Sequence, residues 1–217
     1  IYTGTRQYKL TNTDSEALLK AVPQKSLGLF SIPRNVHKST RPLLQDSNKD
    51  DAFSYKKLFY FTKTNMKSTI RASVYSDMIG MRLFSQDGSI IGELRLVGLL
   101  TESSRHTKLT DVPLIRGKIA ETYNSAKLLS HYHRKSLARI LDNLPRQELF
   151  QAKWEDLYRV ALNLLMTQGT SRVRVFLRED FFKSFTTAIV TIPSIYFVRS
   201  TPVEIREIFK SAFNCNE

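Results

Sequence analysis

The chain has 217 residues, 41% hydrophobic and 24% charged, which are ordinary values for a globular protein, and no apolar run approaches the ~20 residues that span a membrane. Its one cysteine, Cys215, excludes a disulfide framework and cysteine-rich zinc modules, so we expect a cytoplasmic protein. The net charge of +13 admits a basic nucleic-acid-binding protein, but the basic residues are spread along the chain instead of forming one cluster.

The first half of the sequence predicts an antiparallel sheet. Thr5–Leu10 alternates between polar and apolar residues and Ser26–Ile32 is a short apolar run, so both are typical of strands. The polar stretch from Pro33 to Ala52 predicts a surface loop. Three further strands are expected at Lys57–Thr64, Val74–Phe84 and Ser89–Leu100.

Three glycines in the run SQDGSIIGELRLVG, from Ser85 to Gly98, raise the question of a phosphate-binding loop. A dinucleotide loop needs the spacing G-x-G-x-x-G between a strand and a helix. Here the spacing is G-x3-G-x5-G, and the chain continues as a strand. We therefore predict a hairpin turn at Gln86–Ser89, where Asp87 tolerates and Gly88 supplies a positive φ.

Downstream, the apolar period lengthens from 2 to 3.6 residues, which predicts helices. The first helix follows Asp111 as its N-cap, with Pro113 in its first turn. The second ends at Pro145, and its apolar positions are Leu137, Ile140, Leu141 and Leu144. The third carries the clearest apolar stripe, led by Trp154, which we expect to be buried, and it ends at Gly169.

The last part of the sequence predicts a β-β-α unit. The strand RVRVFLRED places Val173, Val175 and Leu177 on one face, and Thr186–Ile192 is the second strand. An amphipathic helix is expected at Pro202–Phe213, packed on one face of the two strands. Because two strands and one helix make an incomplete module, at least one sheet edge should be bare and should pair with a second copy or with a neighbouring domain.

No pattern in the chain predicts a catalytic site. The sequence contains no G-x-S-x-G, H-E-x-x-H or Walker A motif. His131 and His133 are two residues apart with no cysteine nearby, which is typical of an exposed pair and not of metal ligands. Ser104 is close to His106 in a connecting segment, where such neighbours are common without catalysis.

The polar, basic strip at residues 62–71 is the stretch that most resembles a binding site. It follows an aromatic strand and combines basic side chains with hydroxyl and amide groups. Two interpretations stay open: a contact for a small anion or effector, such as a carboxylate or phosphate, or a solvent-exposed connection between two strands. The residues that would make the contact are Lys63, Asn65, Lys67 and Arg71.

Four runs, in order and with matching spacing, resemble the large bacterial NAD-specific glutamate dehydrogenases. They are FTKTNMKSTIRASVYSDMIGMRLFSQDGSIIGELRLVGLLTESS, DVPLIRGKIAE, KSLARILDNLPRQELFQ and VRVFLREDFFKSFTTAIVTIPSIYFVRSTPVEIREIFKSAF. The last run departs from the family pattern at Ser194 and Ile195, where the family has a charged pair. A first residue other than Met, Ile1, agrees with a fragment of a longer protein.

The resemblance implies an α+β fold in three parts. Residues 1–110 would form a PAS-like antiparallel sheet domain, residues 111–170 a helical connector, and residues 171–217 the start of an incomplete, truncated ACT-like domain with a β-β-α order. Such modules belong to the regulatory region of the family, far from its catalytic core.

The same resemblance implies a non-catalytic regulatory and assembly segment of a parent enzyme that converts L-glutamate to 2-oxoglutarate and ammonia with NAD. We therefore expect no catalytic residue, metal or cofactor in this fragment, with NAD bound elsewhere in the parent. The expected partners are the remaining domains of the parent chain, further copies in a homo-oligomer and an amino-acid effector, and not a membrane or a nucleic acid. The alternative interpretation is a stand-alone basic nucleic-acid-binding protein.

Overall fold

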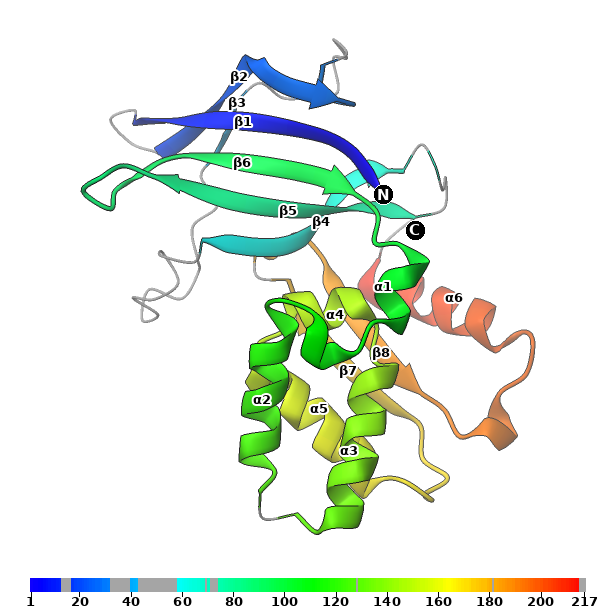
Figure 1. Cartoon of the computed structure of the whole chain (residues 1–217). Helices are drawn as coiled ribbons and strands as arrows, with labels where there is room; N and C mark the ends of the chain where they lie inside the picture. Colours follow the sequence, from blue (N-terminus) through cyan, green and yellow to red (C-terminus); the bar gives the residue numbers. More distant parts are fainter. Residues whose placement is uncertain are drawn as a thin grey trace.

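The computed structural model describes residues 1–12, 17–31, 40–42, 58–68, 70, 74–127, 129–180 and 182–214. A six-stranded sheet stands above a layer of helices, and a two-stranded hairpin followed by a helix lies beside that layer (Figure 1). The α+β class expected from the sequence is confirmed. None of the described helices combines the length and the apolar character that a bilayer crossing requires.

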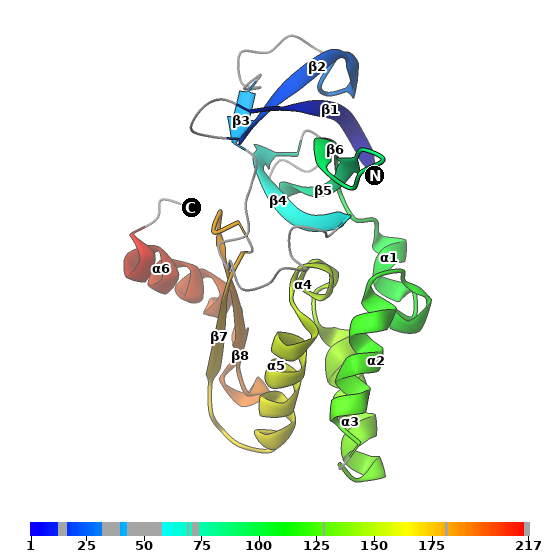
Figure 2. The ribbon, with the colours of Figure 1, turned by 90° about the vertical axis from the view of Figure 1, so that its left-hand side faces the viewer.

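The large sheet is antiparallel throughout, in the order β3-β2-β1-β6-β5-β4. The first strand, β1, therefore lies inside the sheet, between β2 and the later β6. Strand β4 forms the edge that faces the helices (Figure 2). The strands are β1 (Tyr2–Asn12), β2 (Ala17–Gly28), β3 (Thr40–Pro42), β4 (Phe59–Lys67), β5 (Tyr75–Phe84) and β6 (Ile90–Gly98).

The second strand differs from the sequence-based expectation. Of the run expected at Ser26–Ile32, only Ser26–Gly28 lies in β2, which begins at Ala17 and contains Pro23. Residues 29–31 form a turn, and Ile32 lies outside the described residues. Arg6 of β1 pairs with Ser26 and Tyr8 with Ala21, so residues 22–25 of β2, which include this proline, bulge out opposite Gln7. The bulge accommodates a residue that cannot donate to the ladder, which is why a proline-containing stretch still forms a strand.

The loop expected at Pro33–Ala52 is wrong in one place. Within it, Thr40–Pro42 forms β3 and pairs with Leu18 to Lys20 of β2 at the sheet edge. Proline has no N–H to donate to a neighbouring strand, and at the outer edge of a sheet no such donor is needed. The edge position therefore explains how this short strand contains Pro42. The remaining residues of that stretch lie outside the described part of the chain.

The hairpin turn expected at Gln86–Ser89 is confirmed. The Gly88 amide donates to the carbonyl of Ser85 at 3.1 Å, and Gly88 has a φ of 82°. The Asp87 carboxylate accepts the Ser89 amide at 3.0 Å, closing an Asx-type turn. The chain leaves this turn directly into β6, so the three glycines belong to a hairpin and its second strand.

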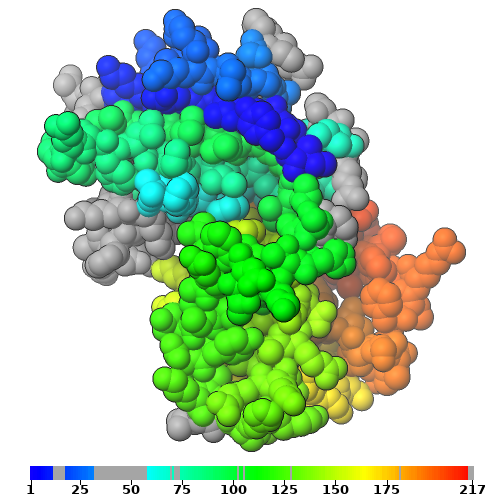
Figure 3. Space-filling model, in the orientation of Figure 1, coloured from blue at the N-terminus to red at the C-terminus, as the bar shows by residue number. Residues whose placement is uncertain are grey.

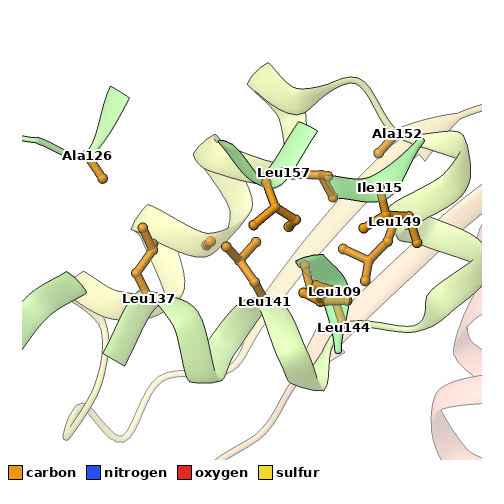
Figure 4. Packing of buried hydrophobic residues seen from close by; sticks show 11 residues of the cluster. Leu109, Ile115, Ala126, Leu137, Leu141, Leu144, Leu149, Ala152 and Leu157 are labelled. Atoms are coloured by element: carbon orange, nitrogen blue, oxygen red, sulfur yellow. The ribbon is translucent and has the colours of Figure 1, made fainter. Parts of the chain in front are cut away.

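Five helices follow, and all but the first contribute to one hydrophobic core (Figure 4). They are α1 (Glu102–His106), α2 (Ile115–Ser125), α3 (His131–Asn143), α4 (Arg146–Gln151) and α5 (Trp154–Met166), with a 3-10 turn at Leu109–Asp111 before α2. The buried stripe of α5 uses Leu157, Ala161 and Leu165, at helical spacing. Helix α3 ends before Pro145, as expected. The side chains at the centre of the core are Ile115, Ile119, Leu137, Leu141, Leu149, Leu157 and Ala161.

Two helical details differ from expectation. Helix α2 begins at Ile115 instead of directly after Asp111, and the residue before it, Leu114, has a φ of 68° and no side-chain cap. Trp154 is only half-buried and lies outside the buried core. It is the first residue of α5, and the buried stripe of the helix begins one turn later, at Leu157.

The C-terminal β-β-α order is as expected, with β7 (Arg174–Glu179), β8 (Thr186–Thr191) and α6 (Thr201–Phe213). The two strands pair only with each other among the described residues. They lie between α5 on one side and α6 on the other (Figure 2). Helix α6 and the segment before it form a lobe at the rim of the molecule, orange to red in Figure 3, and several of their apolar side chains are exposed, namely Ile195, Tyr196, Phe197, Val198, Val203, Ile208 and Phe213.

Candidate functional site

Strand β4 touches both the helical layer and the hairpin, because its side chains alternate between the two faces of the sheet edge. On one face the Phe61 ring stacks on Phe150 of α4, with ring centroids 4.3 Å apart and planes 12° from parallel. On the other face the Tyr60 ring meets the edge of Phe182 at 4.7 Å. We call these contacts, together with the Thr62–Asp180 bond described next, the β4 junction.

The tip of the β7–β8 hairpin is shaped to reach β4. Asp180 is buried and accepts a hydrogen bond from the Thr62 hydroxyl at 3.1 Å. Its second carboxylate oxygen accepts the Phe182 amide at 3.1 Å, and its carbonyl accepts the amide of Lys183, which has a φ of 54°. One carboxylate therefore holds both the tight turn and its contact with the sheet.

A buried polar network lies beside the junction. Glu93 is 1% exposed and Arg95 3% exposed, and they are two residues apart on one face of β6. The Tyr60 hydroxyl and the Arg95 guanidinium both donate to Glu93 Oε1. The Arg95 guanidinium also lies over the Tyr8 ring, 4.9 Å from its centroid. We call these four residues the Glu93 network.

The network keeps fixed protonation states. Burial raises the pKa of Tyr60 well above its ordinary value, so the phenol stays a neutral donor. Burial by itself disfavours the charged guanidinium, but the neighbouring Tyr60 and Glu93 outweigh it and raise the pKa of Arg95. Groups that hold their protons this firmly serve as structural hydrogen-bonding partners and not as acids or bases that exchange protons near neutral pH.

The basic strip predicted at residues 62–71 forms the end of β4 and the turn after it. Lys63 Nζ bonds Asp77 Oδ1 at 2.8 Å and reaches the carbonyl of Tyr75, so a carboxylate already neutralises its charge. The other oxygen of Asp77 accepts the Leu100 amide at 3.2 Å. Lys63 thereby joins β4 to β5, and Asp77 also joins β5 to the chain just after β6.

Of the other three residues of the strip, only Lys67 has a described contact near Lys63. Lys67 Nζ lies 5.8 Å from the centroid of the Tyr75 ring, beside the carbonyl that Lys63 contacts. Asn65 is exposed on the strand, and Arg71 lies outside the described residues. An anion or effector contact at this strip stays a prediction.

A cavity of about 280 Å³ lies between the helices and the inner face of the hairpin. An ion pair at its wall joins the two parts: Arg178 of β7 donates through both Nε and Nη2 to the Glu148 carboxylate, the second bond being 2.8 Å, and Nη2 also donates to Gln151. Both charged side chains are largely buried. The lining is completed by Leu144, Ala152, Asp156, Leu157, Arg159, Val160, Asn163, Val175, Phe176, Leu177, Thr187 and Ile189.

The remaining candidates have structural roles. His131 and His133 are exposed at the start of α3, where Ser130 caps the helix by accepting the His133 amide. The carbonyl of Ser104 in α1 accepts a hydrogen bond from the buried Arg146. Within the described ranges, three or more histidine, cysteine, aspartate or glutamate side chains do not gather as a metal site would require.

The family and the three known proteins that match this chain are all described as glutamate dehydrogenases. Residues 112–170, which hold α2 to α5, match the family described as glutamate dehydrogenase, helical motif 1. The NAD-specific glutamate dehydrogenase of Pseudomonas aeruginosa is 30% identical over 161 residues, which is 74% of this chain and 10% of that protein. The enzymes of the same name from Halomonas elongata and Mycobacterium tuberculosis are 27% and 23% identical over 95% and 80% of this chain.

Residues 112–170, in the helical layer, therefore carry a glutamate dehydrogenase helical motif. More particularly, the chain corresponds to a region of the large NAD-specific glutamate dehydrogenase family, as the four resembling runs indicated. It spans 10% to 13% of the length of these three relatives, so it matches a fragment of each.

Proposed function

We propose that the chain is a non-catalytic regulatory and assembly segment of a large NAD-dependent glutamate dehydrogenase in the cytoplasm. In this proposal the parent converts L-glutamate to 2-oxoglutarate and ammonia, with NAD bound outside this segment. Its partners are the remaining domains of the parent chain, further copies in a homo-oligomer and an amino-acid effector. The sheet (1–110), the helices (111–170) and the C-terminal unit (171–217) act as its three parts.

The β4 junction is the observation that supports this role. Phe61 fixes the sheet to the helical layer, while Tyr60 and Thr62 fix the same strand to the hairpin. Because one strand contacts both neighbours, we expect a shift of the hairpin to reach the sheet through these contacts. The charged groups nearby are engaged in fixed bonds, which suits transmission of a movement better than proton transfer.

The proposal is tested by Phe182→Ala in the full-length protein, with Phe197→Ala as the matched control. Phe182 contacts Tyr60 at the junction, whereas Phe197 is exposed. We expect Phe182→Ala to leave kcat within about twofold of the unchanged enzyme while changing the cooperativity for L-glutamate or the sedimentation coefficient. A large loss of kcat with unchanged assembly, or no change in any of these, would contradict the proposal.

The nucleic-acid alternative is tested separately by a gel-shift titration of residues 1–217 at two salt concentrations. The net charge of +13 is what favours this alternative. Tight binding with a steep salt dependence would support it and would contradict the regulatory assignment.

A further inference from the structure

The outer edge of β7 is open. In the described part of the chain β7 pairs with β8 alone, from Arg174–Thr191 to Glu179–Thr186, so its other edge carries unpaired amide and carbonyl groups. An edge of this kind is a template for a further strand.

The cavity between the helices and the hairpin reaches this edge. Val175 and Leu177 have half-exposed side chains on the face of β7 opposite to that of Arg178, and yet both line the cavity. The opposite wall consists of α5 residues, among them Asp156, Val160 and Asn163. An extended segment added to β7 would therefore lie along α5 and direct every second side chain into the cavity.

The charge along this strand indicates what such a segment carries. Arg178 is neutralised by Glu148. Arg174, on the same face of β7, has a buried Nε without a hydrogen-bond partner in the described residues. A buried donor left without a partner costs about 1–3 kcal/mol, so an acceptor on the added segment would be favoured there. A carboxylate is the acceptor that also matches the positive charge.

A second copy of the same strand is a poor occupant. Two β7 strands paired across a two-fold axis must place residues of the same face opposite one another. Centred on Phe176, the pairing sets Arg174 opposite Arg178 of the second copy, twice, so the second copy offers no acceptor for the unpaired Nε of Arg174. Centred one residue further along, it sets the Glu179 carboxylate against the apolar Val175.

The size of the relatives favours an occupant from the same polypeptide. The chain spans 10% to 13% of their length, so most of each relative lies outside the matched region. A covalently linked segment acts at an effective concentration of about millimolar, which a second molecule rarely reaches.

We propose that the β7 edge, beside the cavity and Arg174, receives an added antiparallel strand from the parent polypeptide outside residues 1–217, with apolar side chains toward the cavity and a carboxylate toward Arg174. The inference rests on the proposed function, because it needs a parent chain. It goes beyond that function by naming the edge, the groove and the chemistry of the segment that fills it.

Hydrogen–deuterium exchange of residues 1–217 and of the full-length protein tests this inference. We expect the outward amides of 174–179 to exchange at least roughly tenfold more slowly in the full-length protein, because added strand pairing protects them. The amides of β6, inside the large sheet in both, serve as the internal control. Equal exchange of β7 in both proteins would overturn the proposal, as would a protected β7 edge in a dimer of residues 1–217.

Arg174→Glu in the full-length protein, against Arg172→Glu as the matched control, tests the carboxylate. Arg172 is exposed and precedes β7. We expect Arg174→Glu to remove at least half of the protection of β7 and Arg172→Glu to leave it, while circular dichroism of residues 1–217 stays unchanged for both. Protection that survives Arg174→Glu would overturn the charge assignment. Glutamate-dependent NADH formation by the unchanged full-length protein separates this failure from a failure of the proposed function.

Discussion

Glu93 is the central residue of the Glu93 network in the large sheet. Its carboxylate accepts bonds from Tyr60 and Arg95 while 1% exposed. A buried charge that loses its partner destabilises the fold by about 3–5 kcal/mol. Glu93 and Arg95 therefore each compensate the buried charge of the other. The position of the Tyr60 ring in turn requires that Gly80, its cross-strand neighbour, has no side chain.

Gly80→Ala tests that requirement. A Cβ at position 80 would lie 1.9 Å from the Tyr60 ring, so the ring must move and release Glu93. We expect a loss of about 2 kcal/mol in the free energy of unfolding, measured with urea. In a Tyr60→Ala background the same substitution should cost much less, because the clash is then absent.

The control for that experiment is Gly117→Ala in α2, where an added Cβ meets nothing within 4 Å. Alanine has the higher helix propensity, so this variant should gain up to about 1 kcal/mol. If both variants change stability by the same amount and sign, the account of Gly80 is wrong.

The turn before β6 makes a second prediction at the residue scale. Hydrogen bonds from Ser85 and Ser89 lower the pKa of Asp87 from 3.8 to about 2. Because the pKa is lowered on folding, the stabilisation is present above pH 3.8 and is lost as the pH falls through about 2. A carboxyl titration followed by NMR checks this value, and Ser85→Ala should shift it upward. A value near 3.8 in the unchanged protein would contradict the turn geometry.

At the scale of elements, the six-residue helix α4 depends on help from α2. A helix this short is marginal alone, and its last carbonyls lack intrahelical partners. Lys118 of α2 donates to the carbonyls of Leu149, Phe150 and Ala152, at 3.0, 2.6 and 2.7 Å. The same α4 carries Phe150 and Glu148, so its stability also sets the β4 junction and the wall of the cavity.

Lys118→Met keeps the length of the side chain and removes its donors. Three carbonyls at the end of α4 then lose a charged partner, so we expect a loss of about 2 kcal/mol in the free energy of unfolding. Lys127→Met, at an exposed position, is the control. A change below about 0.5 kcal/mol for Lys118→Met would show that water replaces the lysine without cost.

Local sequence signals predicted most elements, because alternation and helical spacing report the faces that become buried. The turn at Asp87–Gly88 and the stripe of α5 are examples. Only the end of β2 was predicted, because Pro23 is a strand breaker unless a bulge accommodates it, and only the pairing with β1 creates that bulge. The start of α2 was misplaced because Asp111 belongs to a separate 3-10 turn.

The candidate site was less accessible to sequence reasoning. Glu93 and Arg95 alternate into one face of β6, which is a local signal of a buried charged pair. The partners of that pair, Tyr60 and Tyr8, come from other strands, and no spacing along the chain connects them. The ion pair of Arg178 with a residue 30 positions earlier is of the same kind. Contacts of this sort depend on how elements pack and not on their own periodicity.

At the scale of the whole molecule, the sheet, the helices and the hairpin meet at β4, while several apolar side chains of the C-terminal lobe are exposed. Exposed apolar surface of this extent is typical of an interaction site. A unit joined firmly to its neighbours on one side and open on the other is suited to assembly within a larger enzyme, and this is the core of the proposed function.

The most direct test of that account compares residues 1–217 with the full-length protein in one assay for NADH formation from L-glutamate and NAD. The account predicts turnover by the full-length protein and none above a mock purification for residues 1–217. Turnover by residues 1–217 would contradict the assignment of a non-catalytic segment, and a full-length protein without glutamate-dependent NAD reduction would contradict the proposed parent activity.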